Sequence, residues 1–268
     1  MDRKKKFFYW KLAITVISFV FTVMMISDID WRNLSNNYID PVRWKEIGYD
    51  LGVGVFSAMV LIWFVDEISE HIQDKISKNT EKEKIKRANR ILCKYIERYE
   101  LFFYCVVTPV KQREFENIKM PLEFTFKDMR DLYFSTILIS EGIFDSSIEC
   151  FVKAEKELKD EIELTLRDME FEYFPEIRES LLEFVEVSLK YNEQGAWLSA
   201  KTARAGTKTL ADEVKDMLEN DADNQYKEIK TGKKEYSHNL VHTYIALYEM
   251  LHAERNAILK YKQEIEQI

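Results

Sequence analysis

Two apolar segments, residues 7–26 and 47–65, stand at the front of the chain, and polar stretches with helical periodicity follow them. A helix rises about 1.5 Å per residue, so about 20 residues cross a hydrocarbon core that is about 30 Å thick. Each segment is long enough, or nearly long enough, to form a transmembrane helix. The pattern therefore predicts a two-helix membrane hairpin over residues 1–65, with a short connecting loop at residues 27–46.

The first apolar segment has an alternative interpretation as a cleaved signal peptide, because the cations Arg3 to Lys6 precede it. However, the residues that end the segment, 24–30, lack the paired small side chains that signal peptidase recognises. A second apolar segment also follows soon after the first. We therefore expect the first segment to be retained as a membrane span.

Apolar residues beyond the hairpin recur at alternating steps of three and four, which is the spacing of a helical-bundle seam. One seam extends from Ile85 to Val106, and a second extends from Leu240 to Ile268 with Glu254 as its one polar member. Glycines and prolines are scarce after residue 65 and fall between the periodic stretches. The sequence thus predicts an all-α fold, in which a helical bundle over residues 66–268 begins with a long juxtamembrane helix at residues 66–107.

Further helices are expected between the two seams. Their predicted ranges are residues 127–140, 143–172, 175–191, 197–205 and 207–228. Residues 111–126 contain Pro121 and alternating apolar positions, which favour an extended connector with one short strand at most. The sequence has no internal repeat that would divide the bundle into separate domains.

Cations flank the hairpin on its two outer sides, whereas the connecting loop is acidic. Four cations precede residue 7, and nine lie between Lys75 and Arg98. Lysine and arginine are retained on the cytoplasmic side of a membrane, so we expect two crossings with both termini and the bundle in the cytoplasm.

The part of the 268-residue chain after residue 65 carries 31 basic and 41 acidic side chains. A surface of that sign repels nucleic-acid phosphates and attracts basic proteins, so the bundle is expected to bind a basic protein rather than nucleic acid directly. The three cysteines are odd in number and lack paired close spacing, which indicates reduced core residues.

Two charged clusters are candidate contact surfaces of the bundle. An acidic run is either a solvated helix face or a docking surface for a basic partner. Its candidate docking residues are Glu170, Glu172, Glu176, Glu179 and Glu183. A basic patch after the second span is explained largely by topology, but it is also suited to contact anionic lipid or nucleic acid. The residues of that patch are Lys82, Lys84, Lys86, Arg87 and Arg90.

Small residues make the second span a candidate packing surface. The packing residues are Gly48, Gly52, Gly54, Ser57 and Ala58. Small side chains let helix backbones approach closely in lipid, so this surface is expected to meet the first span or another copy of the protein. Asp50 either marks the end of the span or, in an assembly of hairpins, lines the outer mouth of a cation-conducting pore.

The sequence contains no glycine-rich phosphate loop, no G-x-S-x-G turn and no H-E-x-x-H pair. We therefore expect neither an enzyme nor a bound cofactor. One alternative is a metal site on the last helix, where four potential ligands share about a third of the circumference. These are His238, His242, Glu249 and His252. A helical di-iron site requires a second E-x-x-H pair, which the chain lacks, so no metal is expected.

The lysine-rich N-terminus, the F-F-Y-W-K entry at residues 7–11, the short loop and the following helical domain resemble the two-transmembrane effectors of bacterial antiphage systems, particularly those encoded beside retrons. The resemblance covers the whole chain in architecture and rests on no diagnostic motif. It implies a toxin of the bacterial inner membrane that a reverse transcriptase, carrying multicopy single-stranded DNA, holds silent until phage interference releases it. The acidic bundle would then dock on the basic reverse transcriptase, and contact with nucleic acid would be mainly indirect.

Three hypotheses of function follow. The leading one is an antiviral, abortive-infection effector that damages the inner membrane on release from its partner complex, with a homo-oligomer as a candidate active form. The first alternative is a nontoxic membrane anchor or sensor that recruits a soluble complex through the bundle. The second alternative is a membrane-tethered helical metalloenzyme.

Overall fold

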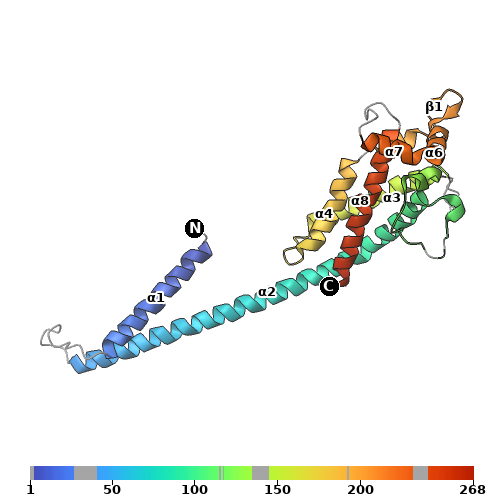
Figure 1. Cartoon of the computed structure of the whole chain (residues 1–268). Helices are drawn as coiled ribbons and strands as arrows, with labels where there is room; N and C mark the ends of the chain where they lie inside the picture. The colour runs from blue at the N-terminus through green and yellow to red at the C-terminus, as the bar shows by residue number, and fades with distance from the viewer. Residues whose placement is uncertain are drawn as a thin grey trace. The chain divides into compact units, whose positions relative to one another are not determined.

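The computed structural model describes residues 3–26, 41–114, 116, 118–134, 145–191, 193–231 and 241–268 (Figure 1). It is 82% helical, which confirms the all-α prediction. The chain divides into two compact units, Met1–Asn79 and Thr80–Ile268. One helix, α2 (Pro41–Val107), contributes residues to both units, so the helix predicted to begin at residue 66 is continuous with the second apolar segment.

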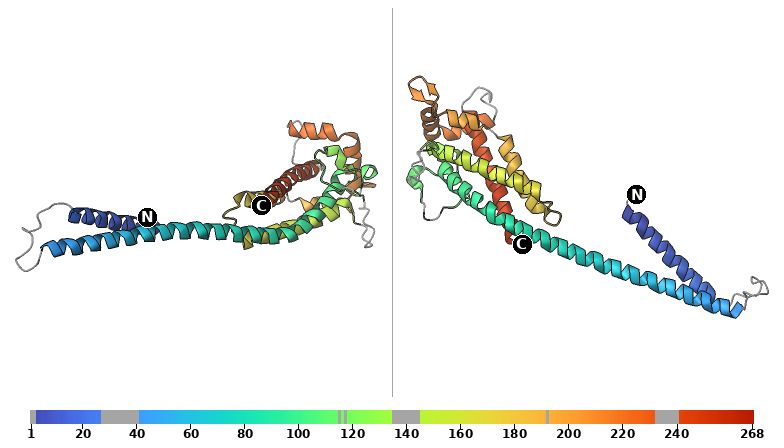
Figure 2. Two further views of the ribbon diagram at one scale, coloured as in Figure 1. Left: turned by 90° about the horizontal axis from the view of Figure 1, so that it is seen from below. Right: turned by 180° about the vertical axis from the view of Figure 1, so that it is seen from behind.

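The first unit contains α1 (Arg3–Ile26) and the N-terminal part of α2, which run antiparallel. The rings of Phe19 and Phe56 lie 5.6 Å apart, and Lys11 near the start of α1 forms an ion pair with Asp66. Figure 2 shows that the C-terminal end of α1 meets α2 near its N-terminal end, and its right-hand view shows α1 diverging from α2 toward the N-terminus. One described helix, α2, is long and apolar enough to cross a membrane, whereas the described apolar part of α1, Trp10–Met24, is shorter.

The second unit is a bundle built around Tyr99. The C-terminal part of α2 packs with α3 (Ser147–Asp168), α4 (Pro175–Lys190) and α8 (Val241–Glu266). The fully buried Tyr99 ring lies 5.5 Å from Phe151 of α3 and 5.6 Å from Phe184 of α4. Aromatic rings at such distances contribute favourable edge contacts in addition to buried area.

Most positions of the two predicted seams are buried in this core, whereas Ala88, Tyr95, Ile265 and Ile268 are half-buried. On α2, Ile85, Leu92 and Tyr99 are buried, and on α8 the buried positions include Leu247 and Leu251. Leu240, the expected first member of the α8 seam, lies outside the described residues.

Short elements close one end of the bundle. They are η2 (Val110–Gln112), η3 (Phe126–Asp131), α5 (Gln194–Ser199), β1 (Arg204–Ala205), β2 (Lys208–Thr209), α6 (Leu210–Asn220) and α7 (Ala222–Lys230). The two strands pair antiparallel. Buried Trp197 anchors α5 because its indole Nε1–H donates to the carbonyl of Thr243 on α8 at 2.9 Å.

The structure corrects three of the expected helices. The helix predicted at residues 207–228 is interrupted at Asp221, which separates α6 from α7. The helix predicted at residues 197–205 ends at Ser199, because the chain turns into the β1–β2 hairpin around Gly206, whose φ of 70° favours glycine. The described start of the helix predicted at residues 127–140 is 3₁₀-helical, and residues 135–144 lie outside the described part.

Candidate functional site

Helix α1 presents a row of hydroxyl groups toward α2. Each hydroxyl donates to a carbonyl of its own helix: Thr15 to Lys11, Ser18 to Thr15 and Thr22 to Ser18, at 2.8 to 2.9 Å. Polar groups that are satisfied within a helix can face an apolar neighbour at little cost. This row therefore suits close packing of α1 against α2.

The two helices approach each other closely at Gly52. A Cβ added at Gly52 would lie 2.5 Å from Thr22 Oγ1 and 3.3 Å from Thr22 Cα, so the backbones leave no room for a side chain. Gly48, one turn earlier on α2, is also buried. These two glycines lie on the α1 side of α2.

The other three candidate packing residues lie elsewhere on α2. A Cβ added at Gly54 meets nothing within 4 Å, and Ser57 and Ala58 are exposed. The small residues thus belong to two groups, one that faces α1 and one that is open. Asp50, the candidate pore-mouth residue, is exposed near the start of the helix.

The apolar N-terminal part of α2 is almost entirely exposed among the residues that the structure describes. Only 6% of the most apolar 18-residue window of α2 is buried within the protein, whereas a core helix of a soluble protein would be mostly buried. Leu51, Leu61 and Phe64 are among its exposed side chains. Between Asp50 and Asp66 this surface contains 15 uncharged residues.

The acidic candidate docking residues all lie on the surface of the bundle. Glu176, Glu179 and Glu183 are exposed on α4, and Glu170 and Glu172 are exposed in the connector between α3 and α4. The opposite side of α4 packs against α8 through buried residues such as Leu181 and Phe184. One of these carboxylates lies near a cation of the bundle itself: Lys260 Nζ of α8 is 3.9 Å from a carboxylate oxygen of Glu183.

The basic candidate residues lie on α2, within the second unit. Lys82 is half-buried, and Lys84, Lys86, Arg87 and Arg90 are exposed. At 100° per residue, Lys82, Lys86 and Arg90 follow one side of the helix, and Lys84 and Arg87 lie on another. The patch therefore extends around part of the helix rather than forming one compact surface.

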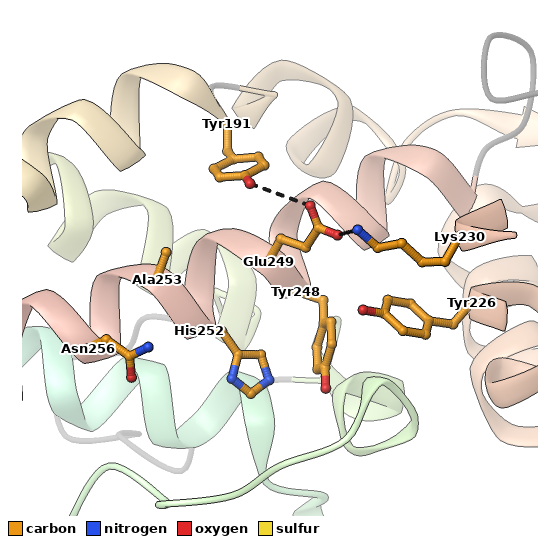
Figure 3. A pocket seen from close by; sticks show the side chains of 8 residues that line it. All are labelled: Tyr191, Tyr226, Lys230, Tyr248, Glu249, His252, Ala253 and Asn256. Carbon is orange, nitrogen blue, oxygen red and sulfur yellow. Dashed lines mark hydrogen bonds and ion pairs between the residues drawn. The ribbon is translucent and has the colours of Figure 1, made fainter. Parts of the chain in front are cut away.

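A pocket of about 440 Å³ opens between α7, α8 and the end of α4 (Figure 3). Its walls combine tyrosine rings with an ion pair: Glu249 contacts Lys230 and accepts a hydrogen bond from Tyr191 at 3.4 Å. The other lining residues are Tyr226, Tyr248, His252, Ala253 and Asn256. Sequence reasoning missed this pocket because its aromatic side chains come from three separate elements.

The imidazole of His252 is held in this wall by stacking. Its ring lies 4.1 Å from the ring of Phe124 at an interplanar angle of 11°, and Tyr248 meets it edge-on at 4.5 Å. Burial, and then the nearby Arg255 guanidinium, lower the pKa of His252. The side chain is thus neutral at physiological pH and suited to hydrogen bonding.

The metal-site residues of the last helix do not converge. His242 Nδ1 lies 3.9 Å from a carboxylate oxygen of Glu193, while Glu249 and His252 make the contacts described above. Across the described residues, no three His, Cys, Asp or Glu side chains gather as metal ligands. His238, the fourth candidate, lies outside the described residues.

The cysteines are free thiols, with Cys105 buried and Cys93 and Cys150 half-buried. Burial raises the pKa of the Cys105 thiol to about 11, so this group is protonated and unreactive at neutral pH.

Among the residues that the structure describes, Glu155 and Glu254 are the buried glutamates, and neither carboxylate is hydrogen-bonded to a cation of that part of the chain. Glu254 of α8 accepts a hydrogen bond from the Tyr99 hydroxyl at 2.7 Å, and its other oxygen, Oε1, has no hydrogen-bond partner among the described residues. Glu155 of α3 accepts hydrogen bonds from Ser188 and from Gln194. The seam pattern indicated Glu254 as a polar member, but no sequence signal indicated that Glu155 is also buried.

Comparison of the chain with protein-family models, with curated proteins and with solved structures finds no match.

Proposed function

We propose that this protein is a membrane effector of a bacterial antiphage defence system, which a partner complex holds inactive and which disrupts the inner membrane on release. The observation that carries the proposal is the uncovered apolar surface of the hairpin, 6% buried in its most apolar window. Such a surface requires lipid or another helix to cover it. The defence role comes from the resemblance of the sequence to retron-associated two-transmembrane effectors.

The proposed topology has two crossings with both termini in the cytoplasm. The cations before residue 7 and after residue 75 support this orientation, because they flank the two outer ends of the hairpin. The Lys11–Asp66 ion pair supports it as well, since it joins the two helices at the end where those cations lie. Charged side chains at that end belong in the headgroup region or in water.

The proposed partner is a basic protein, in this case a reverse transcriptase with its multicopy single-stranded DNA. The exposed carboxylates of α4, among them Glu176 and Glu179, give the bundle a negatively charged face that complements such a partner. Lipid or nucleic acid at the basic residues of α2 is a secondary contact in this proposal.

The test is expression of the full chain with and without its partner, followed with a potential-sensitive dye and by growth. Without the partner we expect depolarisation and growth arrest. Leu61→Lys should abolish both effects, because it places a charge in the middle of the apolar run at a cost of about 3 kcal/mol. Leu164→Lys, at an exposed leucine on α3 of the bundle, is the matched control and should leave toxicity unchanged.

A second candidate function is a nontoxic membrane anchor or sensor, which the tyrosine-lined pocket of the bundle favours. A sensor requires a site that binds a ligand and whose occupancy changes a contact of the bundle. This candidate predicts that cells expressing the full chain without a partner keep their membrane potential and grow normally. That result would overturn the effector proposal.

A further inference from the structure

One apolar stripe follows α2 along a single side, away from α1. In the part of the helix between Asp50 and Asp66, the stripe consists of Leu51, Gly54, Ala58, Leu61 and Val65. The steps between these residues alternate between three and four, which is the repeat of a helix that packs lengthwise against another helix. All five residues are exposed.

The stripe continues beyond Asp66 into a segment with the composition of a water-exposed helix. Ile68, Ile72 and Ile76 extend it, and their side chains are 45%, 52% and 60% exposed. At about 1.5 Å per residue, Ile76 lies about 15 Å past Asp66 along the helix. Lipid tails can cover the first part of the stripe, but they do not reach this far beyond a charged residue.

The acidic side chains of the same segment lie outside the stripe. Asp66, Glu67, Glu70 and Asp74 are exposed, and at 100° per residue all four lie on the other side of α2 from the isoleucines. The stripe itself carries no charge from Leu51 to Ile72. It therefore does not select a basic or an acidic partner, and two identical stripes meet without like-charge repulsion.

We propose that this stripe of α2 is the surface through which a second copy of the chain binds, side by side and in parallel. The proposal rests on the membrane placement proposed above and adds the residues through which two copies of α2 touch. The flanking cations orient every copy in the same direction, so two copies in one membrane meet with their stripes in register. The helix that covers the stripe must cross the membrane and continue into water with apolar residues at the same three-and-four spacing. The α2 helix of a second copy meets that requirement.

Gly54 and Ala58 give the membrane part of this contact its close approach. A Cβ at Gly54 meets nothing within 4 Å in one chain, so the space beside it is available to the backbone of a second helix. In the water-exposed part, the three isoleucines of each copy bury one another. Close packing stabilises the membrane part of the contact, and the hydrophobic effect stabilises the water-exposed part.

Disulfide cross-linking of the full-length protein in native membranes tests the proposal. In a background with Cys93→Ser and Cys150→Ser, we expect Ile72→Cys to form an intermolecular disulfide at least about tenfold faster than Glu70→Cys, because proximity raises the effective concentration of the two thiols. Glu70 is exposed in the same segment but lies on the acidic side of α2. Equal rates for the two variants, or a faster rate for Glu70→Cys, would overturn the proposal.

A second variant pair tests the membrane part without touching the hairpin contact. Gly54→Leu should slow the Ile72→Cys cross-link several-fold, because its side chain fills the space that the second helix occupies. Val60→Leu, at an exposed position away from the stripe, should leave the rate unchanged. An unchanged rate in Gly54→Leu would remove the membrane part of the proposed contact.

The same preparations separate this inference from the proposed function. Membranes that depolarise without the Ile72→Cys cross-link would overturn self-association through the stripe and leave the effector function standing. A fast cross-link in cells that keep their potential would support self-association and overturn the effector function.

Discussion

At the scale of single residues, two glycines that the sequence predicts to be packing residues of the second span have different surroundings. Gly52 lies against Thr22 of α1, and Gly54 faces open space. Helical periodicity tells which positions share a side of a helix, but not which neighbour that side meets. For this reason the sequence predicted the small residues of α2 as a group and could not divide them.

Gly52→Val is predicted to loosen the hairpin. Its Cβ would lie 2.5 Å from Thr22 Oγ1, and relieving that overlap costs about 1 to 3 kcal/mol. The measurement is disulfide formation between Lys11→Cys and Asp66→Cys, which replace the ion pair of α1 and α2. The rate should fall in Gly52→Val and stay unchanged in Gly54→Val; equal rates in both variants would show that the glycine contact does not hold the hairpin together.

The buried carboxyl of Glu254 makes the stability of the bundle depend on pH. Burial, and then the negative charge of Glu155 on α3, raise the pKa of Glu254 well above its ordinary value of 4.5, while Tyr99 and Lys159 act in the opposite direction. Burial also raises the pKa of Glu155. The folded bundle therefore keeps protons that the unfolded chain loses, so its free energy of unfolding falls as the pH rises above 4.5.

Glu254→Gln is predicted to stabilise the bundle at pH 7.5 and to have little effect at pH 4. Glutamine keeps an acceptor for the Tyr99 hydroxyl and removes the charge that burial disfavours. We expect a gain of about 1 kcal/mol, or a rise of about 2 to 4 °C in Tm, measured by thermal unfolding in detergent. Glu179→Gln, at an exposed position on α4, is the control; a destabilised Glu254→Gln variant at pH 7.5 would contradict the assignment.

At the scale of elements, the long amphipathic helices were predictable and the short ones were not. The steps of three and four on α2 and α8 are repeated over many turns, and Tyr99 and Leu247 are buried as they indicate. The break between α6 and α7 lies at a single residue, Asp221, which ends α6 and precedes α7 and whose carboxylate oxygens accept hydrogen bonds from the side-chain amides of Asn224 and Gln225. A break at a single residue is a weak signal within an otherwise helical pattern.

The exposed glutamates of α4 are predicted to bind the basic partner protein. Replacing Glu176 and Glu179 by lysine should weaken copurification of a basic partner by about tenfold or more at low salt, because attraction becomes repulsion. The loss should shrink as salt screens the charges. Replacing Glu213 and Glu219 of α6 by lysine changes the net charge equally on another helix and should have a smaller effect. Equal losses for the two pairs would indicate that net charge, rather than the α4 face, attracts the partner.

At the scale of the whole molecule, composition and charge indicated that membrane helices precede a helical domain, but not which surfaces of the domain have a shape suited to binding. The tyrosine-lined pocket shows why. Tyr191, Tyr226 and Tyr248 are separated in the sequence, and only the packing of α4, α7 and α8 brings them to one wall. Long-range neighbours of this kind leave no local pattern in a single sequence.

The uncharged run of 15 residues between Asp50 and Asp66 has a consequence for the membrane itself. At about 1.5 Å per residue the run is about 22 Å long, which is about 8 Å less than a typical hydrocarbon core. A bilayer that α2 crosses can thin around it, at a cost of a fraction of a kcal/mol for each Å of mismatch. Copies that share one thinned zone reduce this elastic cost, so acyl-chain length becomes a determinant of how strongly the protein clusters and deforms its membrane.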